Sequence, residues 1–235
     1  MNYFEPLKFI DEYKNIGIIY EDNHVLVIHK PRNIPVQADS SNDESIQQLL
    51  QSYLKEKYQK PGNVFLGIVH RLDRPVSGLM IFAKTSKAAS RLSEQMRSYA
   101  FKKKYVACVS GVPEKKEVLI NFLKKNSETN IVSVVNKQDK TAQEAELSYS
   151  LIQSNGKTSF VLIDLKTGRP HQIRVQFSHR NNPIIGDGKY GKDFGKTSKL
   201  ELKSCFLQFE HPTSKETLSF SGIIADTAIW KDFHL

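Results

Sequence analysis

The sequence predicts an α+β fold, in which a mixed, mainly antiparallel sheet is flanked by a few helices and loops. Two observations lead to this class. Short runs rich in Val, Ile, Phe and Tyr outnumber the segments with helical periodicity, and most of these runs follow one another directly along the chain. Strands that follow one another without a crossover helix pair in the antiparallel sense, so we do not expect a doubly wound parallel sheet.

The first half of the chain alternates strands with two amphipathic segments. Residues 16–31 predict a hairpin around a polar turn, and residues 46–58 predict a helix with Asp43 or Ser45 as its N-cap, because Ile and Leu recur there at helical spacing. We expect the further elements to be strands at 64–69 (VFLGIV), 79–84 (LMIFAK) and 102–111 (KKKYVACVSG), and a helix through KAASRLSEQMRS that Ser86 caps.

The second half predicts mostly strands. Residues 113–140 are polar and irregular, with one hairpin arm at 131–135. The runs AELSYSLI and SFVLIDL predict a hairpin around the SNGK turn, and SCFLQFEHP and TLSFSG predict two closing strands. In KTGRPHQIRVQFSH, Gly168 gives a turn, Pro170 suits the first helical position, and a short helix follows that places His171, Arg174 and Ser178 on one face.

The length of 235 residues suits one sizeable domain, and we expect an N-terminal extension at 1–15 followed by a single domain at 16–235. The cysteines, Cys108 and Cys205, lie in apolar strand-like runs and read as buried, reduced thiols, which favours a cytoplasmic protein. The N-terminus carries charges throughout and lacks the apolar core of a signal peptide, and no apolar run approaches the length of a membrane span.

The chain is basic, with 34 Lys+Arg against 25 Asp+Glu and a formal net charge of +9. Such an excess says nothing about the fold, but it favours an anionic partner such as nucleic acid. The basic residues are not gathered into one amphipathic stripe, so a role at a membrane surface is less favoured.

The segment HRLDRPVSG places one carboxylate, Asp73, between Arg71 and Arg74. Nearby guanidinium groups keep a carboxylate ionised, and such a carboxylate can react. From these residues alone, an ion pair that fixes a turn is the more favoured interpretation, since structural pairs also perturb titratable groups.

Two other segments carry candidate functional residues. Arg174, in HQIR, has the guanidinium fork that matches a carboxylate or a phosphate, and Arg169 and His171 lie at the start of the same predicted helix. Tyr105 follows three lysines on a predicted strand, where an aromatic ring can stack on a base while the lysines meet phosphates. The alternatives are a solvated helix arginine and a core tyrosine.

Other chemistries find little support in the sequence. His70 and Asp73 would face opposite sides of an extended segment, and no pair of histidines has metal-ligand spacing on a helix, so we expect no metal. No second acid accompanies Asp73 as glycoside hydrolysis usually requires. The segment GDGKYG lacks the ending of a phosphate-binding P-loop.

Taken in order, the motifs HRLDRPVSG, LMIFAKT, KKYVACVSG, LKTGRPHQIRVQFSH, GDGKYG and FEHPTSKETLSF resemble the RluA-type pseudouridine synthases. The resemblance runs from about residue 18 to about residue 220. It implies the pseudouridine synthase fold, with an active-site cleft across the sheet, in a short member without the N-terminal S4-type domain. Two departures stand out, Val76 where many members have threonine, and Lys203-Ser204 where a His-Ala pair is common.

The resemblance also implies roles for individual residues. Asp73 matches the catalytic aspartate, Tyr105 the tyrosine that packs on the target base, and Arg174 the arginine that pairs with the aspartate. Arg71 matches a residue that helps to displace the target nucleotide. We expect RNA contacts from the following residues: Arg71, His70, Arg74, Lys84, Lys102, Lys103, Lys104, Arg169 and His171.

The expected function is therefore the isomerisation of specific uridines in structured tRNA or rRNA by a cytoplasmic enzyme. Uridine and pseudouridine are isomers, so the reaction needs no redox cofactor, and we expect none. The partner is RNA, with no membrane and no obligatory protein partner, and the protein is expected to be a monomer. An RNA-binding protein of the same fold without catalysis is the alternative.

Overall fold

The computed structural model describes residues 3–191 and 199–232, and in it the chain forms two compact units. The first unit comprises Met1–Lys102 and Ser204–Ala225, and the second comprises Lys103–Lys203 and Asp226–Leu235. The predicted single domain at 16–235 spans both units, and the predicted extension at 1–15 contributes a strand to the first. Within the described residues, no helix is both long and apolar enough to cross a membrane.

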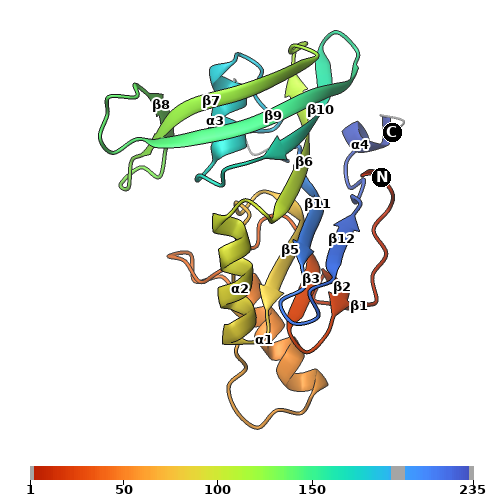
Figure 1. The fold of residues 1–235 in the computed structure, drawn as a ribbon. Coiled ribbons are helices and arrows are strands. Elements are labelled where there is room, and N and C mark those ends of the chain that lie inside the picture. The colour runs from red at the N-terminus through yellow and green to blue at the C-terminus, as the bar shows by residue number, and fades with distance from the viewer. Residues whose placement is uncertain (1–2, 192–198, 233–235) are drawn as a thin grey trace. The chain divides into compact units, whose positions relative to one another are not determined.

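The first unit contains a sheet in the order β1-β2-β3-β5-β11, with β4 paired to β5 and β12 paired to β11. Figure 1 shows β12 beside β11. Its pairings β1–β2, β2–β3, β3–β5 and β11–β12 are antiparallel, as the sequence predicts. Its elements are β1 (Asp11–Tyr13), β2 (Ile16–Glu21), β3 (Val25–Lys30), α1 (Ile46–Lys57), β4 (Gly67–Ile68), β5 (Ser77–Ala83), α2 (Ser86–Arg97), β11 (Leu202–Glu210), whose first two residues belong to the second unit, and β12 (Thr217–Ser221).

The second unit contains a sheet in the order β6-β10-β9-β7-β8, and each of these pairings is antiparallel. The mainly antiparallel α+β class that the sequence predicts is thus confirmed. The elements of this unit are β6 (Lys102–Ser110), β7 (Lys116–Lys125), β8 (Val132–Val135), β9 (Gln143–Ser154), β10 (Thr158–Leu165), α3 (Gln172–His179) and α4 (Ala228–Asp232).

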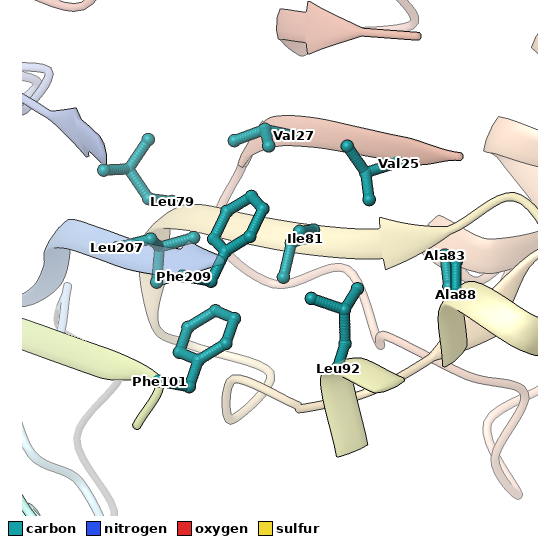
Figure 2. Packing of buried hydrophobic residues seen from close by; sticks show 10 residues of the cluster. All are labelled: Val25, Val27, Leu79, Ile81, Ala83, Ala88, Leu92, Phe101, Leu207 and Phe209. Carbon is teal, nitrogen blue, oxygen red and sulfur yellow. The ribbon is translucent and has the colours of Figure 1, made fainter. Parts of the chain in front are cut away.

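The core of the first unit lies between α2 and one face of the sheet (Figure 2). Ile81 of β5 faces Leu92 of α2, and Ala83 packs against Ala88, so the helix covers alternate residues of β5. The intervening residues Met80 and Phe82 are also fully buried. Both faces of β5 are therefore covered, which explains its continuous apolar sequence.

Gly78 is the one position of the HRLDRPVSG motif where a side chain cannot be accommodated. Its φ is +121°, and a Cβ there would lie 2.2 Å from the carbonyl oxygen of Ser204 in β11. The close approach of two backbones explains why the motif ends in glycine.

We predict that Gly78→Ala lowers the free energy of unfolding by about 2–4 kcal/mol, because it combines a strained φ with a steric clash. Chemical denaturation measures the loss. Gly62→Ala is the matched control, since nothing lies within 4 Å of its Cβ position, and it should change stability by less than about 1 kcal/mol. Equal effects of the two substitutions would contradict this account.

Several boundaries differ from the sequence prediction. Ser45 caps α1 as predicted, but Thr85 rather than Ser86 caps α2. The predicted strand at 64–69 shrinks to β4, because the side-chain amides of Gln47 and Gln51 bind the carbonyls of Leu66 and Val64. These amides take the place of a strand partner over most of the segment.

The predicted irregular segment 113–140 contains the ten-residue strand β7. Its apolar residues lie on both faces, with Leu119 and Leu123 buried and Val118 and Ile120 more than half exposed, so no clean alternation marks the strand. Pairing with β9 over eight residues produces it. The helix α4 was likewise not predicted.

The Lys203-Ser204 departure belongs to the packing of the C-terminal segment. Lys203 is 1% exposed, forms an ion pair with Asp226, and its ammonium lies 5.1 Å from the ring centroid of Trp230. The indole N–H of Trp230 donates to Glu201. Lys203 therefore takes part in the packing of the second unit, which gives its departure from the common His-Ala pair a structural explanation.

Candidate active site

Asp73 lies in a tight turn between β4 and β5. The amide of Val76 donates to the Asp73 carbonyl at 3.0 Å, which closes the turn, while Leu72 and Val76 bury their side chains on either side. The Asp73 side chain is left half-buried at the tip. Val76 is 3% exposed, so the valine that replaces the more common threonine has the apolar surroundings it needs.

A buried lysine binds the backbone of this turn. Lys30, at the end of β3, is fully buried, and its ammonium donates to the carbonyls of Arg74 at 3.0 Å, Val76 at 2.9 Å and Pro31 at 3.0 Å. The three N–H groups of an ammonium match these three acceptors. Sequence reasoning missed Lys30, although a lysine that ends the apolar run VLVIHK was a visible signal.

Burial lowers the pKa of Lys30 from 10.5 to about 7, although the carboxylate of Asp73 raises it. The unfolded chain therefore binds more protons than the folded one between pH 7 and 10.5, and stability rises with pH across that window.

We predict that the stability difference between the wild type and Lys30→Met grows as pH rises from 7 to 10. The slope should approach at most about 1.4 kcal/mol per pH unit, the limit for one proton. Urea denaturation at several pH values measures it, and subtraction of the variant removes the contribution of other titrating groups. A difference that stays constant with pH would show that Lys30 is charged throughout.

The two arginines that flank Asp73 differ in their surroundings. Arg71 is exposed and, within residues 3–191 and 199–232, makes no ion pair. Arg74 forms an ion pair with Asp43 and lies 3.7 Å from a carboxylate oxygen of Asp39. The local sequence favours an ion pair between Asp73 and its neighbouring arginines that fixes the turn. Arg71 does not form such a pair among the described residues.

In the second unit, Arg174 of α3 forms a buried ion pair with Asp187. Its Nε and Nη2 donate to the two carboxylate oxygens, each at 2.8 Å, and the side chains are 7% and 0% exposed. Burial raises the pKa of Asp187, but the bonds from Arg174 outweigh it and hold the pKa below its usual value. This contact uses one edge of the guanidinium, and Nη1 belongs to the other edge, where a second carboxylate can bind.

Tyr190 holds the same arginine from another side. Its ring centroid lies 5.1 Å from the guanidinium carbon, which is a cation–π distance. Its hydroxyl lies 2.6 Å from Nδ1 of His171 and accepts the amide of Val132 at 2.9 Å. The amide of Tyr190 in turn donates to Asp187 at 3.0 Å. Arg174 is therefore fixed by Asp187 and Tyr190, two residues of the GDGKYG segment.

His171 precedes α3 in a left-handed conformation with φ of +53°, which is uncommon for a residue with a side chain. Pro170 thus lies before the helix rather than at its first position. Such strain persists only where the surroundings impose it, and it clusters at functional sites. Sequence reasoning named His171 but missed Asp187 and Tyr190 as site residues, because GDGKYG was considered as a phosphate loop and as a family motif without a role for its individual side chains.

Tyr105 lies on β6, 5% exposed, opposite Ile163 of β10. Of the lysines before it, Lys104 forms an ion pair with Asp164 at 2.6 Å and Lys102 is exposed. Burial lowers the pKa of Lys103, which makes no ion pair in the part of the chain that the structure describes. Lys102 and Lys103 are thus the lysines of this run without a carboxylate partner.

Three residues that are predicted to contact RNA make contacts within the protein. The Nε2 of His70 accepts the amide of Ile81 at 3.1 Å, which ties the motif to β5. Lys84 is 8% exposed and pairs with Glu21 at 2.7 Å. The Nε of Arg169 donates to the carbonyl of Glu144 at 2.9 Å. The RNA contact of Lys84 stays a prediction, which its buried and already paired ammonium does not favour.

Asp73 belongs to the first unit, whereas Tyr105 and Arg174 belong to the second. The pairing of Asp73 with Arg174 and the packing of Tyr105 on a target base therefore stay predictions. Among the described residues, no group of three His, Cys, Asp or Glu side chains is arranged to hold a metal ion. Burial raises the pKa of Cys108 to about 12, so its thiol is not a ready nucleophile.

Known protein families and relatives show which family this chain belongs to. The profile of the family described as RNA pseudouridylate synthase matches residues 24–179. The chain belongs to this family. A ribosomal large subunit pseudouridine synthase C of Buchnera aphidicola is 34% identical over 87% of the chain, which spans 65% of that relative's length. A tRNA pseudouridine synthase C of Vibrio parahaemolyticus is 32% identical over 90% of the chain and 92% of its own length.

Solved structures agree on the fold. The human RNA pseudouridylate synthase domain-containing protein 4 superposes with a TM-score of 0.76, covering 91% of this chain and 90% of its own, at 22% sequence identity. The pseudouridine synthase fold that the motifs predict is thus confirmed, and the matched range contains Asp73, Tyr105 and Arg174.

Proposed function

We propose that the protein is an RNA pseudouridine synthase that isomerises specific uridines in tRNA or rRNA, with Asp73 as its catalytic residue and without a cofactor. Membership of the family over residues 24–179 carries this proposal. Relatives named for ribosomal RNA and for tRNA support both substrate classes.

The reaction assigns a task to each proposed residue. The C1′–N1 bond of uridine breaks, the base turns, C5 bonds to C1′, and the proton on C5 leaves while N1 gains one. The Asp73 carboxylate either adds to the sugar or removes the 2′ proton to give a glycal. Arg174 would orient the Asp73 carboxylate, since Asp187 and Tyr190 fix its guanidinium in advance.

RNA binding has its own set of residues. The target nucleotide must leave its stack, at a cost of a few kcal/mol, and phosphate contacts from a chain of net charge +9 offset that cost. Arg71 is proposed to displace the target nucleotide, because it is exposed and makes no ion pair among the described residues. Lys102 and Lys103 are proposed as phosphate contacts, and Tyr105 as the residue that stacks on uracil.

A cytoplasmic, monomeric enzyme without an obligatory protein partner completes the proposal. The family fold without catalysis, acting only by binding RNA, is the alternative, and the Asp73, Tyr105 and Arg174 set argues against it.

The test incubates the purified chain with unmodified tRNA and large-subunit rRNA transcripts. Because the product has the same mass as uridine, pseudouridine is detected by carbodiimide labelling. We expect labelled positions to appear, and a chelator to leave their yield unchanged. Binding of either RNA without labelled positions would favour the alternative, and loss of activity with the chelator would contradict the cofactor-free reaction.

A further inference from the structure

The guanidinium of Arg74, next to Asp73 in sequence, is occupied by a nearby loop. Its Nη1 donates to Ser41 Oγ at 2.9 Å, its Nη2 pairs with Asp43, and Asp39 lies 3.7 Å away. Its Nε donates to the carbonyl of Asn33 at 3.1 Å. We call residues 39–43 the acidic loop.

The acidic loop is internally ordered to present its carboxylates. The Oγ and the amide of Ser41 donate to Asp39 at 2.6 and 2.9 Å, and these bonds lower the pKa of Asp39. Asn42 takes a left-handed φ of +60°, a conformation that asparagine tolerates. Two residues after the loop, Ser45 is the N-cap of α1, so the C-terminal end of the loop is anchored.

This ion-pair cluster faces solvent. The side chains of Arg74, Asp39 and Asp43 are 41%, 43% and 54% exposed. Exposed ion pairs contribute little stability, so the cluster is a poor candidate for a structural clamp. Lys30 and the bond from the Asn33 amide to the Arg74 carbonyl already hold the backbone of the turn.

A phosphate carries the same kind of anionic oxygens as the Asp43 carboxylate, and a guanidinium binds both through the same fork. Exchange of one anion for the other at Arg74 therefore keeps its charge compensated. The displaced carboxylate returns to water from a position that is already half-exposed, so the exchange costs little free energy.

We propose that the acidic loop occupies a phosphate-binding position at Arg74 in the RNA-free protein, and that a phosphate of the bound RNA displaces Asp43 there. The inference rests on the proposed function, because it takes RNA as the ligand. An RNA that places a phosphate beside the turn gains Arg74, whereas an RNA bound elsewhere on the basic surface does not. Displacement of Asp43 therefore lowers the affinity of the RNA that contacts Arg74 by a small amount, and the guanidinium stays paired with the loop when RNA binds elsewhere.

The test compares RNA affinity at several salt concentrations for the wild type and Asp39→Asn/Asp43→Asn, which keeps the shape of the loop and removes its charge. We expect binding to unmodified tRNA transcripts to tighten about three- to tenfold, because Asp43 no longer has to be displaced, while the slope of log K against log salt stays the same, because the phosphate contact at Arg74 forms in both proteins. Adding Arg74→Gln to the double variant should remove the gain in affinity and reduce the salt slope by about 0.7–0.9, the value for one phosphate contact.

The control is Glu94→Gln/Asp139→Asn. It adds the same two units of charge by neutralising Glu94 and Asp139, which pair with Arg97 and Lys124. An equal gain in this control would show a general charge effect and overturn the proposal. Unchanged affinity with a lower unfolding midpoint would overturn it in favour of a structural brace. Pseudouridine formation, measured in parallel, reports on the proposed function separately, because the binding changes do not require catalysis.

Discussion

Asp73→Asn is expected to abolish pseudouridine formation while RNA binding stays within about twofold of the wild type. An amide can neither add to C1′ nor remove a proton, so the rate should fall by at least about three orders of magnitude, as when other catalytic groups are removed. Single-turnover assays on a transcript that the wild type modifies measure the rate, and filter binding measures the affinity.

The matched control for this substitution is Asp139→Asn, which neutralises a half-buried aspartate paired with Lys124. It should retain full activity. If Asp73→Asn still formed pseudouridine at a tenth of the wild-type rate or more, Asp73 would not be the reacting carboxylate, and the favoured local interpretation of a turn-fixing residue would stand.

Asp187→Asn is expected to lower the free energy of unfolding by about 3–5 kcal/mol, because it leaves Arg174 buried without its counter-ion. Activity should fall as well, with a larger effect on kcat than on KM, since Arg174 is proposed to act on the catalytic carboxylate rather than on RNA affinity. Denaturation and steady-state kinetics measure the two effects.

A second variant separates stability from chemistry. Arg174→Met/Asp187→Asn removes both charges, and the amide oxygen can still accept the Lys189 and Tyr190 backbone amides that Asp187 Oδ1 accepts. We expect it to recover most of the stability but none of the activity. Recovery of pseudouridine formation together with stability would show that Arg174 has only a structural role.

The elements that local sequence determines were predicted well. Strand β5 follows from its continuous apolar run, and α1 from Ser45 together with apolar residues at helical spacing. The capping box, in which Ser45 and Gln48 bind each other's backbone amides, is readable in the letters SIQQ.

Elements that depend on distant partners were not predicted. The carbonyls of 64–66 meet glutamine side chains of α1 instead of a strand, and β7 forms because β9 pairs with it. The site shows the same division. The motifs identified Asp73 and Arg174, but not Lys30, which binds the backbone of the Asp73 turn, or Asp187, which pairs with Arg174. Both act through tertiary contacts, and only the lysine at the end of the apolar run VLVIHK gave a local signal.

The most direct test of the central claim maps pseudouridines in total RNA from cells that lack this gene and carry either the wild-type chain or Asp73→Asn. The account predicts that specific positions in tRNA or rRNA are pseudouridine with the wild type and uridine with the variant. Identical maps in the two strains would contradict it.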